Sequence, residues 1–334
     1  MAHAITALLG VLVLTAAPLG SAPARPTPAA KPAPVPEPQF LFDIATSTGT
    51  SESTWATVAY DRKHDELFVV TGGLVRVFNA AAMESYTFGG DGDLGSAERV
   101  ALLEGGDILL LTSEGGRHTV VRCDFRGERL GPFQLKAIPE EFAGFEPDRI
   151  QVQGDQVYLV QIGLMRVVVT DFLGQVERAF DLATLVREKD PTIKTGMNGF
   201  WADPQGNFVF TMPYAFTAFV LSPSGELQQF GKRGSSPGKF NIVGSVAGDE
   251  AGNLFILDRL RSVVMMFDPA LKFVVEFGYR GNGPSNLVAP YDIAVGNGKV
   301  FVSQARDRGV KVFHYKPPSR TETTAAPATG AGGG

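Results

Sequence analysis

Residues 230–268 read FGKRGSSPGKFNIVGSVAGDEAGNLFILDRLRSVVMMFD. A Gly-rich loop opens this stretch, and Asp-Glu-Ala-Gly-Asn at 249–253 predicts a turn, because Asp, Gly and Asn favour chain reversal. The Gly-rich pattern returns as FGYRG from Phe277. Between the two Gly-rich loops, short strands are predicted at 244–247, 254–257, 263–267 and 273–277. Four short antiparallel strands in a unit of this length predict one blade of a β-propeller.

The same unit recurs along the chain. The strand after each early turn begins at Leu67, Ile108, Val157, Phe208, Leu254 and Val300, in steps of 41, 49, 51, 46 and 46 residues. Phe-Gly pairs give a second register: the gap of 142 residues from Phe88 to Phe230 is about three times the gap of 47 from Phe230 to Phe277. Phe133 and Phe180 lie near the two intermediate positions. We therefore expect six repeats.

The sixth repeat is one strand short. Strands are predicted at 291–295, 299–303 and 309–315, and Pro317-Pro318 follows. An apolar segment without a neighbouring partner, QFLFDIA at 39–45, would supply the missing outermost strand and remove an exposed sheet edge. The prediction is an all-β, six-bladed β-propeller spanning residues 39–316, closed by its N-terminal strand.

The order of motifs in residues 230–315 resembles the NHL repeat. It runs FG-x-x-G, Gly-x-Phe, Asp-x-x-Gly-Asn-Leu-Phe-Ile-Leu-Asp, and then an apolar strand closed by Phe-Asp. The resemblance implies a six-bladed propeller of the bacterial, exported type, and NHL propellers bind proteins, RNA or small molecules. Fold alone does not choose among these roles.

Both ends of the chain have a biased composition. Residues 1–24 are interpreted as a secretory signal, since the apolar run at 5–17 is too short to span a bilayer and Ala22-Pro23-Ala24 fits a cleavage site. Export to the periplasm or the exterior follows, with a membrane tether if the signal stays uncleaved. Residues 25–38 form a Pro/Ala-rich linker, and the Pro/Thr/Ala/Gly-rich tail at 317–334 is predicted to be disordered.

Composition limits the classes of function. The net charge of −5 argues against a general nucleic-acid binder. The lone Cys123 excludes an internal disulfide and any cysteine-based metal or haem site, and a buried strand cysteine is the favoured interpretation. No transmembrane span is expected after signal removal, and we expect a monomer.

Acidic and histidine residues do not converge on a metal motif. Asp61, Asp203 and Asp249 occupy equivalent turns, where turn geometry explains them better than calcium binding. His64, His118 and His314 belong to different blades or ends of blades, so no three-histidine set is predicted. The propeller also resembles that of peptidyl-hydroxyglycine lyases and lactonase-type hydrolases, which implies, as an alternative function, a metal-dependent lyase or hydrolase using the axial pocket. No cofactor is predicted, although an axial calcium bound by Asp, Glu or Asn remains open.

One charge pattern stands out. Residues 231–320 hold thirteen Lys/Arg against seven Asp/Glu, a local charge of +6, whereas the rest of the chain carries −11. Loops that join blades and loops that join second and third strands share one face of a propeller, so eight cations should gather there: Lys232, Arg233, Lys239, Arg259, Arg261, Arg280, Arg306 and Arg308. We expect a non-catalytic binding or scaffold module that holds a protein or an anionic envelope ligand through these loops of blades five and six.

Overall fold

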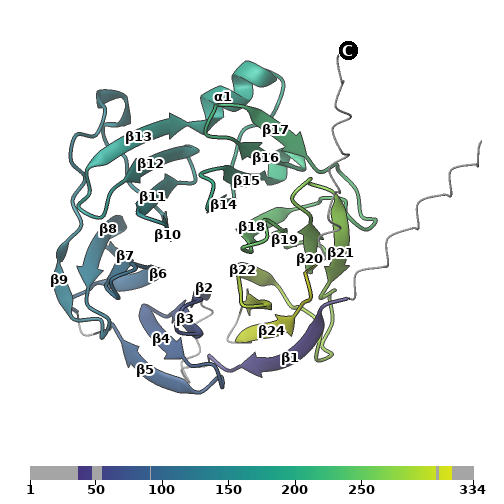
Figure 1. Ribbon diagram of the computed structural model, residues 1–334, viewed down its shortest axis with the longest axis horizontal. Coiled ribbons are helices and arrows are strands. Elements are labelled where there is room, and N and C mark those ends of the chain that lie inside the picture. Colours follow the sequence, from purple (N-terminus) through teal and green to yellow (C-terminus); the bar gives the residue numbers. More distant parts are fainter. Residues whose placement is uncertain (1–36, 47–54, 91, 306–307, 318–334) are drawn as a thin grey trace, which may run out of the picture. The chain divides into compact units, whose positions relative to one another are not determined.

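The chain forms six antiparallel sheets of four strands, arranged as the blades of a propeller around a central axis (Figure 1). The computed structural model describes residues 37–46, 55–90, 92–305 and 308–317. The predicted signal at 1–24, most of the linker at 25–38 and most of the tail at 317–334 lie outside these residues. The predicted fold class is confirmed, and within the described residues no helix is long and apolar enough to cross a membrane.

Blades one to five each use four consecutive strands, numbered from the axis outward. The first three blades consist of β2 (Thr57–Asp61), β3 (Glu66–Thr71), β4 (Leu74–Phe78), β5 (Glu84–Phe88), β6 (Ser96–Leu102), β7 (Ile108–Glu114), β8 (Arg117–Cys123), β9 (Arg129–Pro132), β10 (Arg149–Gln153), β11 (Gln156–Gln161), β12 (Arg166–Thr170) and β13 (Val176–Asp181). The next two consist of β14 (Gly199–Ala202), β15 (Phe208–Met212), β16 (Thr217–Leu221), β17 (Leu227–Phe230), β18 (Val243–Gly248), β19 (Leu254–Asp258), β20 (Val263–Phe267) and β21 (Phe273–Phe277).

The sixth blade joins the two ends of the described chain. It has the order β22 (Pro290–Gly296), β23 (Lys299–Gln304), β24 (Val310–His314) and then β1 (Gln39–Ile44). β1 runs antiparallel to β24, with Gln39 opposite His314 and Ile44 opposite Val310. An ion pair of 2.8 Å between Lys311 and Asp43 links the two strands. The predicted closure by the N-terminal strand is therefore confirmed.

The turn aspartates act through hydrogen bonds, as the sequence predicts. In the turn between β18 and β19, Asp249 Oδ1 accepts the backbone N–H groups of Ala251 and Asn253 at 2.9 and 2.8 Å. Asn253 Nδ2 donates to the second carboxylate oxygen at 2.7 Å. Asp203 makes the equivalent bonds in the preceding blade. In blades four and five these bonds fix the chain reversal that places the first strand beside the second.

Apolar side chains fill the space between neighbouring blades. Phe88, Phe230 and Phe277, which mark the repeat in the sequence, end the outermost strands β5, β17 and β21 and are buried. Cys123 is fully buried at the end of β8. The core therefore forms a ring of hydrophobic clusters, each shared by adjacent blades.

The helical segments are not predicted from the repeat. α1 (Leu182–Lys189) follows β13, and its N-terminal residue is preceded by Asp181, whose side chain accepts the Thr184 N–H at 2.9 Å. Leu182 and Val186 bury one side of α1 against the core of blades three and four. The short 3₁₀ helices η1 (Glu140–Phe142) and η2 (Pro213–Ala215) lie in loops.

The propeller has two faces, which carry different sets of loops. The upper face carries the loops between blades and the loops between second and third strands. The lower face carries the turns between first and second strands and between third and fourth strands. Gln39 and His314 adjoin the lower face, because Tyr315 donates to Gly298 O, in the turn between β22 and β23, at 2.9 Å.

Candidate functional site

Three upper-face loops of blades five and six contain cations and no acidic residue. They are residues 231–242, 259–262 and 278–289. The structure joins them, since Arg261 Nη1 donates to Lys239 O at 3.0 Å and Arg280 Nη2 donates to Leu260 O at 2.9 Å. We call this surface, together with Trp55 and Tyr291 beside it, the basic face.

Arg259 of the basic face is held by two aromatic rings. Its guanidinium carbon lies 5.2 Å from the ring centroids of both Trp55 and Tyr291, and the two rings are 4.8 Å apart. Aromatic faces attract cations, so both rings hold the side chain without neutralising its charge. Trp55 still exposes 47% of its surface. Arg259 is therefore pre-oriented at a position that a ligand can reach.

Apolar side chains are exposed among these cations. Ile242, Leu260 and Tyr279 are exposed large hydrophobic residues, one in each of the three acid-free loops. Arginine and aromatic residues are enriched at protein interfaces and in their energetic centres. The basic face thus combines positive charge with apolar contact area.

The eight predicted cations do not share one environment. Arg261 forms an ion pair with Glu276, whose side chain is only 3% exposed, so this arginine holds the loops together. Arg233 stacks on Phe216 with 4.6 Å from its guanidinium carbon to the ring centroid. Lys232, Arg280 and Arg308 are exposed and Lys239 is half-buried, whereas Arg306 lies outside the described residues.

The other half of the upper face carries acidic side chains. Asp93 lies in the loop between β5 and β6, and Glu140, Glu141 and Glu146 lie in the loop between β9 and β10. Blades one to three therefore oppose blades five and six in charge. The upper face is electrically bipolar.

A channel along the axis is divided into two cavities. The lower one, of about 1090 Å³, is lined by the inner strands and by the turns of the lower face. The upper one, of about 410 Å³, lies at the opposite mouth. Thr57, Arg99 and Arg149 line both cavities. Charged side chains therefore separate the two halves of the channel.

Asp292 is the buried acid at this division. Its Oδ2 accepts from Arg99 Nη1 at 3.1 Å and from the Val58 N–H at 3.2 Å, and its Oδ1 accepts from Ser245 Oγ at 2.6 Å. Burial opposes ionisation of Asp292, but the charges of Arg99 and Arg149 and the bonds from Ser245 and Val58 more than offset it. The pKa of Asp292 therefore lies below its ordinary value.

The buried guanidinium of Arg149 has fewer hydrogen-bond partners than the carboxylate of Asp292. Its Nη2 donates to Asn198 O at 3.1 Å, but its enclosed Nε has no hydrogen-bond partner among the described residues. Burial, followed by repulsion from Arg99, lowers the pKa of Arg149 to about 10. On the upper side, both carboxylate oxygens of Asp148 accept the Ile162 N–H at 3.1 Å.

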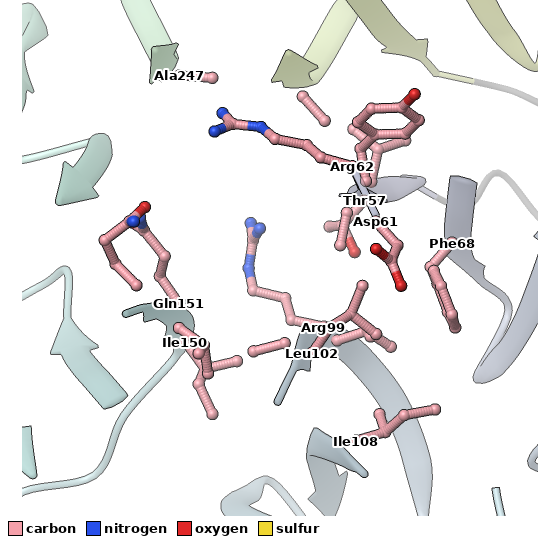
Figure 2. A pocket seen from close by; sticks show the side chains of 18 of the residues that line it. Thr57, Asp61, Arg62, Phe68, Arg99, Leu102, Ile108, Ile150, Gln151 and Ala247 are labelled. Carbon is pink, nitrogen blue, oxygen red and sulfur yellow. The ribbon is translucent and has the colours of Figure 1, made fainter. Parts of the chain in front are cut away.

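Figure 2 shows two further polar side chains in the lower cavity, Arg62 and Gln151, beside Arg99. Arg62 Nη2 donates to the carbonyl oxygens of Gly248 and Val295 at 2.8 and 3.1 Å. Gln151 exchanges two hydrogen bonds with the backbone of Ala202. Backbone carbonyls orient the Arg62 guanidinium, and its acidic partner, Glu250 at 3.8 Å, is exposed to solvent.

The acidic and histidine side chains of the described residues are spread over both faces and the axis of the propeller. Among them, no group of three or more His, Cys, Asp and Glu side chains is arranged to hold an ion. His64 pairs with Asp61 on the lower face, and His118 pairs with Glu98 near the upper face. Around the axis, two guanidinium groups share one buried carboxylate, which does not fit the oxygen-rich shell that calcium takes.

Several of these residues cannot be recognised from sequence. Trp55 contacts Arg259, and Arg99 contacts Asp292, although the two residues of each pair are far apart in the sequence. Propeller closure brings them together, and no local spacing marks either pair. The excess of Lys and Arg in residues 231–320, placed in loops of one face, is the signal by which the sequence identifies the basic face.

The fold and the site define a six-bladed β-propeller with a bipolar upper face and an arginine-lined channel. No family model matches the sequence, and no curated protein matches it. Solved structures do resemble it. Virginiamycin B lyase from Staphylococcus aureus has a TM-score of 0.59 at 9% identity, covering 84% of this chain and 99% of the lyase.

Two other solved propellers are similar. A structural-genomics protein of unknown function from Bacteroides thetaiotaomicron has a TM-score of 0.58 at 14% identity, covering 82% of this chain and 72% of that one. YCF48 from Cyanidioschyzon merolae has a TM-score of 0.54 at 13% identity, covering 81% and 98%. At these identities the likeness shows the propeller fold alone.

Proposed function

We propose that the protein is a binding module that holds an acidic segment of a partner protein on the basic face of blades five and six. One observation carries this proposal: Arg259 packs over both Trp55 and Tyr291 in a cluster of loops that contains no acidic residue. The planar guanidinium is suited to carboxylates, which it can bind through two parallel hydrogen bonds. Because the rings already fix the side chain, less conformational entropy is lost on binding.

Two features favour a protein over an extended polyanion or an anionic bilayer. The exposed Ile242, Leu260 and Tyr279 offer contacts that a partner's apolar side chains can fill. The acidic half of the upper face, which includes Glu140 and Glu141, would repel a uniformly anionic surface laid across the whole propeller. A protein with a localised acidic segment avoids that repulsion.

We also propose a family for the protein and a location for it outside the cytoplasm. The motif order in residues 230–315 supports an NHL-type propeller, and the apolar run at 5–17 with its small-residue site supports export. The partner would then belong to the periplasm or the exterior. We infer that the protein acts as a monomer.

The alternative function, a metal-dependent lyase or hydrolase, has weaker support. A histidine-to-alanine variant of virginiamycin B lyase is described as catalytically inactive, so that enzyme depends on a histidine. In this chain His64 and His118 pair with acids near opposite faces, and His314 ends β24. No histidine among the described residues lines the division between the two cavities.

The fluorescence anisotropy of a labelled peptide gives a direct test. A peptide of glutamates with two leucines, and the same peptide with glutamine in place of glutamate, are titrated against the protein. We expect saturable binding of the acidic peptide only. The double variant Arg259→Ala, Arg280→Ala should lose about tenfold in affinity, which is about 1.4 kcal/mol.

Arg187→Ala on the exposed end of α1 is the matched control and should bind like the parent. Binding should also weaken as ionic strength rises to about 0.15 M, where the screening length falls to about 8 Å. Equal affinity for the acidic and the glutamine peptide, or unchanged affinity in the double variant, would overturn the proposal.

A further inference from the structure

The lower cavity is a second candidate binding site, separate from the basic face. It opens among the turns of the lower face, at the end of the axis opposite Trp55 and Arg259. Its volume of about 1090 Å³ is slightly above the range of small-molecule sites, about 300–1000 Å³. A small ligand could therefore enter without contact with the basic face.

Positive charge exceeds negative charge deep in this cavity. Arg62, Arg99 and Arg149 line it; Arg99 and Arg149 face the one buried acid Asp292, and Arg62 pairs at 3.8 Å with the exposed Glu250. Asp292 already accepts bonds from Arg99, Ser245 and the Val58 backbone. This single carboxylate therefore cannot neutralise both Arg99 and Arg149.

The remaining acids of the lining lie at the cavity mouth. Among the described residues these are Asp61, Glu66 and Glu104, near the turns of blades one and two, where Lys63 and His64 accompany them. Asp61 is occupied by the His64 ring at 2.6 Å and by the Lys63 N–H at 2.8 Å. On the upper side, Asp148 faces Arg149 across the division. The interior of the lower cavity stays positive.

The arginines are held rigidly for binding. Arg99 is fixed by its bond to Asp292, and Arg62 by the carbonyl oxygens of β18 and β22. Apolar side chains, including Ile150, Trp201 and Ala247, cover the adjoining walls. The cavity therefore offers both fixed polar groups and an apolar wall to a small molecule.

We propose that the lower cavity binds a small organic anion, with its carboxylate or phosphate group between Arg62 and Arg99 and its apolar part against Ile150 and Trp201. The anion supplies the negative charge that Asp292 alone does not provide. In a partly desolvated cavity this attraction is stronger than on the exposed surface. The apolar wall selects an anion with a hydrophobic body over a bare ion.

Trp201 reports on this cavity, because the chain has two tryptophans and Trp55 is on the upper face. In the full chain carrying Trp55→Phe, Trp201 emission is followed during titration with benzoate, inorganic phosphate and uncharged benzamide. We expect a saturable change with benzoate, a weaker one with phosphate, and none with benzamide. A stronger response to phosphate would assign a phosphate-bearing ligand.

Arg62→Gln tests the assignment without disturbing the ion pair at the division. It should weaken benzoate binding at least tenfold, whereas Arg187→Gln on α1 should leave it within twofold. Unfolding by urea is measured in parallel, and equal midpoints show that the variant is folded. No change with either anion, an equal response to benzamide, or full affinity in a folded Arg62→Gln variant would overturn the proposal.

Discussion

At the scale of the residue, two arginines in one short loop have opposite roles. Arg259 is held by aromatic rings and keeps its charge available, whereas Arg261 turns inward to Glu276. Glu276 also accepts the Gly238 N–H at 3.2 Å, so it joins the loop at 231–242 to the loop of Arg261. The second cation is therefore structural, although sequence places both in the same group of predicted binding residues.

Arg261→Ser should lower the free energy of unfolding by about 3 kcal/mol, because it leaves Glu276 buried without its counter-ion. Arg280→Ser, on the exposed neighbouring loop, should change it by about 0.5 kcal/mol or less. Urea denaturation of the two variants measures this difference. Similar midpoints for both would mean that the ion pair is not required for stability.

The sequence predicts the role of a residue when that role depends on its neighbours in the chain. The aspartates of the turns, such as Asp203 and Asp249, follow from turn chemistry and from their place in each repeat. The pairing of Arg99 with Asp292 depends on which strands line the axis, and 193 residues separate the two. Nothing in the neighbourhood of either residue could have indicated it.

At the scale of the element, β1 is the clearest case of long-range pairing read from sequence. An apolar strand without a neighbour and a last repeat lacking its outer strand complete each other. α1 was missed because the repeat pattern directs attention to strands. Its signals are present: Asp181 before an amphipathic segment, and Arg187 and Lys189 in its last turn.

Removing residues 1–38 should leave the urea midpoint nearly unchanged, because it spares every strand of the propeller. Removing residues 1–45 should destabilise the protein severely, since it exposes the edge of β24 and removes the Asp43–Lys311 ion pair and the buried Ile44. The difference between the two truncated proteins measures the contribution of β1 to stability. Equal stability of the two proteins would show that closure by β1 is not needed.

At the scale of the whole molecule, the two proposed sites lie on opposite faces. The basic face is formed by loops of blades five and six, and the anion cavity opens on the lower face. The chain enters β1 and leaves β24 beside the lower face, so a connection through either end leaves the basic face accessible. A partner can therefore bind above while a small ligand occupies the cavity below.

The most direct test of the central claim is site-specific photocrosslinking of the full chain in its native cells. The photoreactive residue p-benzoylphenylalanine replaces Leu260 in the basic face or, as a control, Met83, which is exposed between β4 and β5 on the lower face. The proposal predicts an adduct from Leu260 that maps by mass spectrometry to a protein segment rich in Asp and Glu. That adduct should disappear with Arg259→Ala and should not form from Met83. An adduct to phospholipid, an adduct to a segment without excess acidic residues, or equal crosslinking from Met83 would contradict the account.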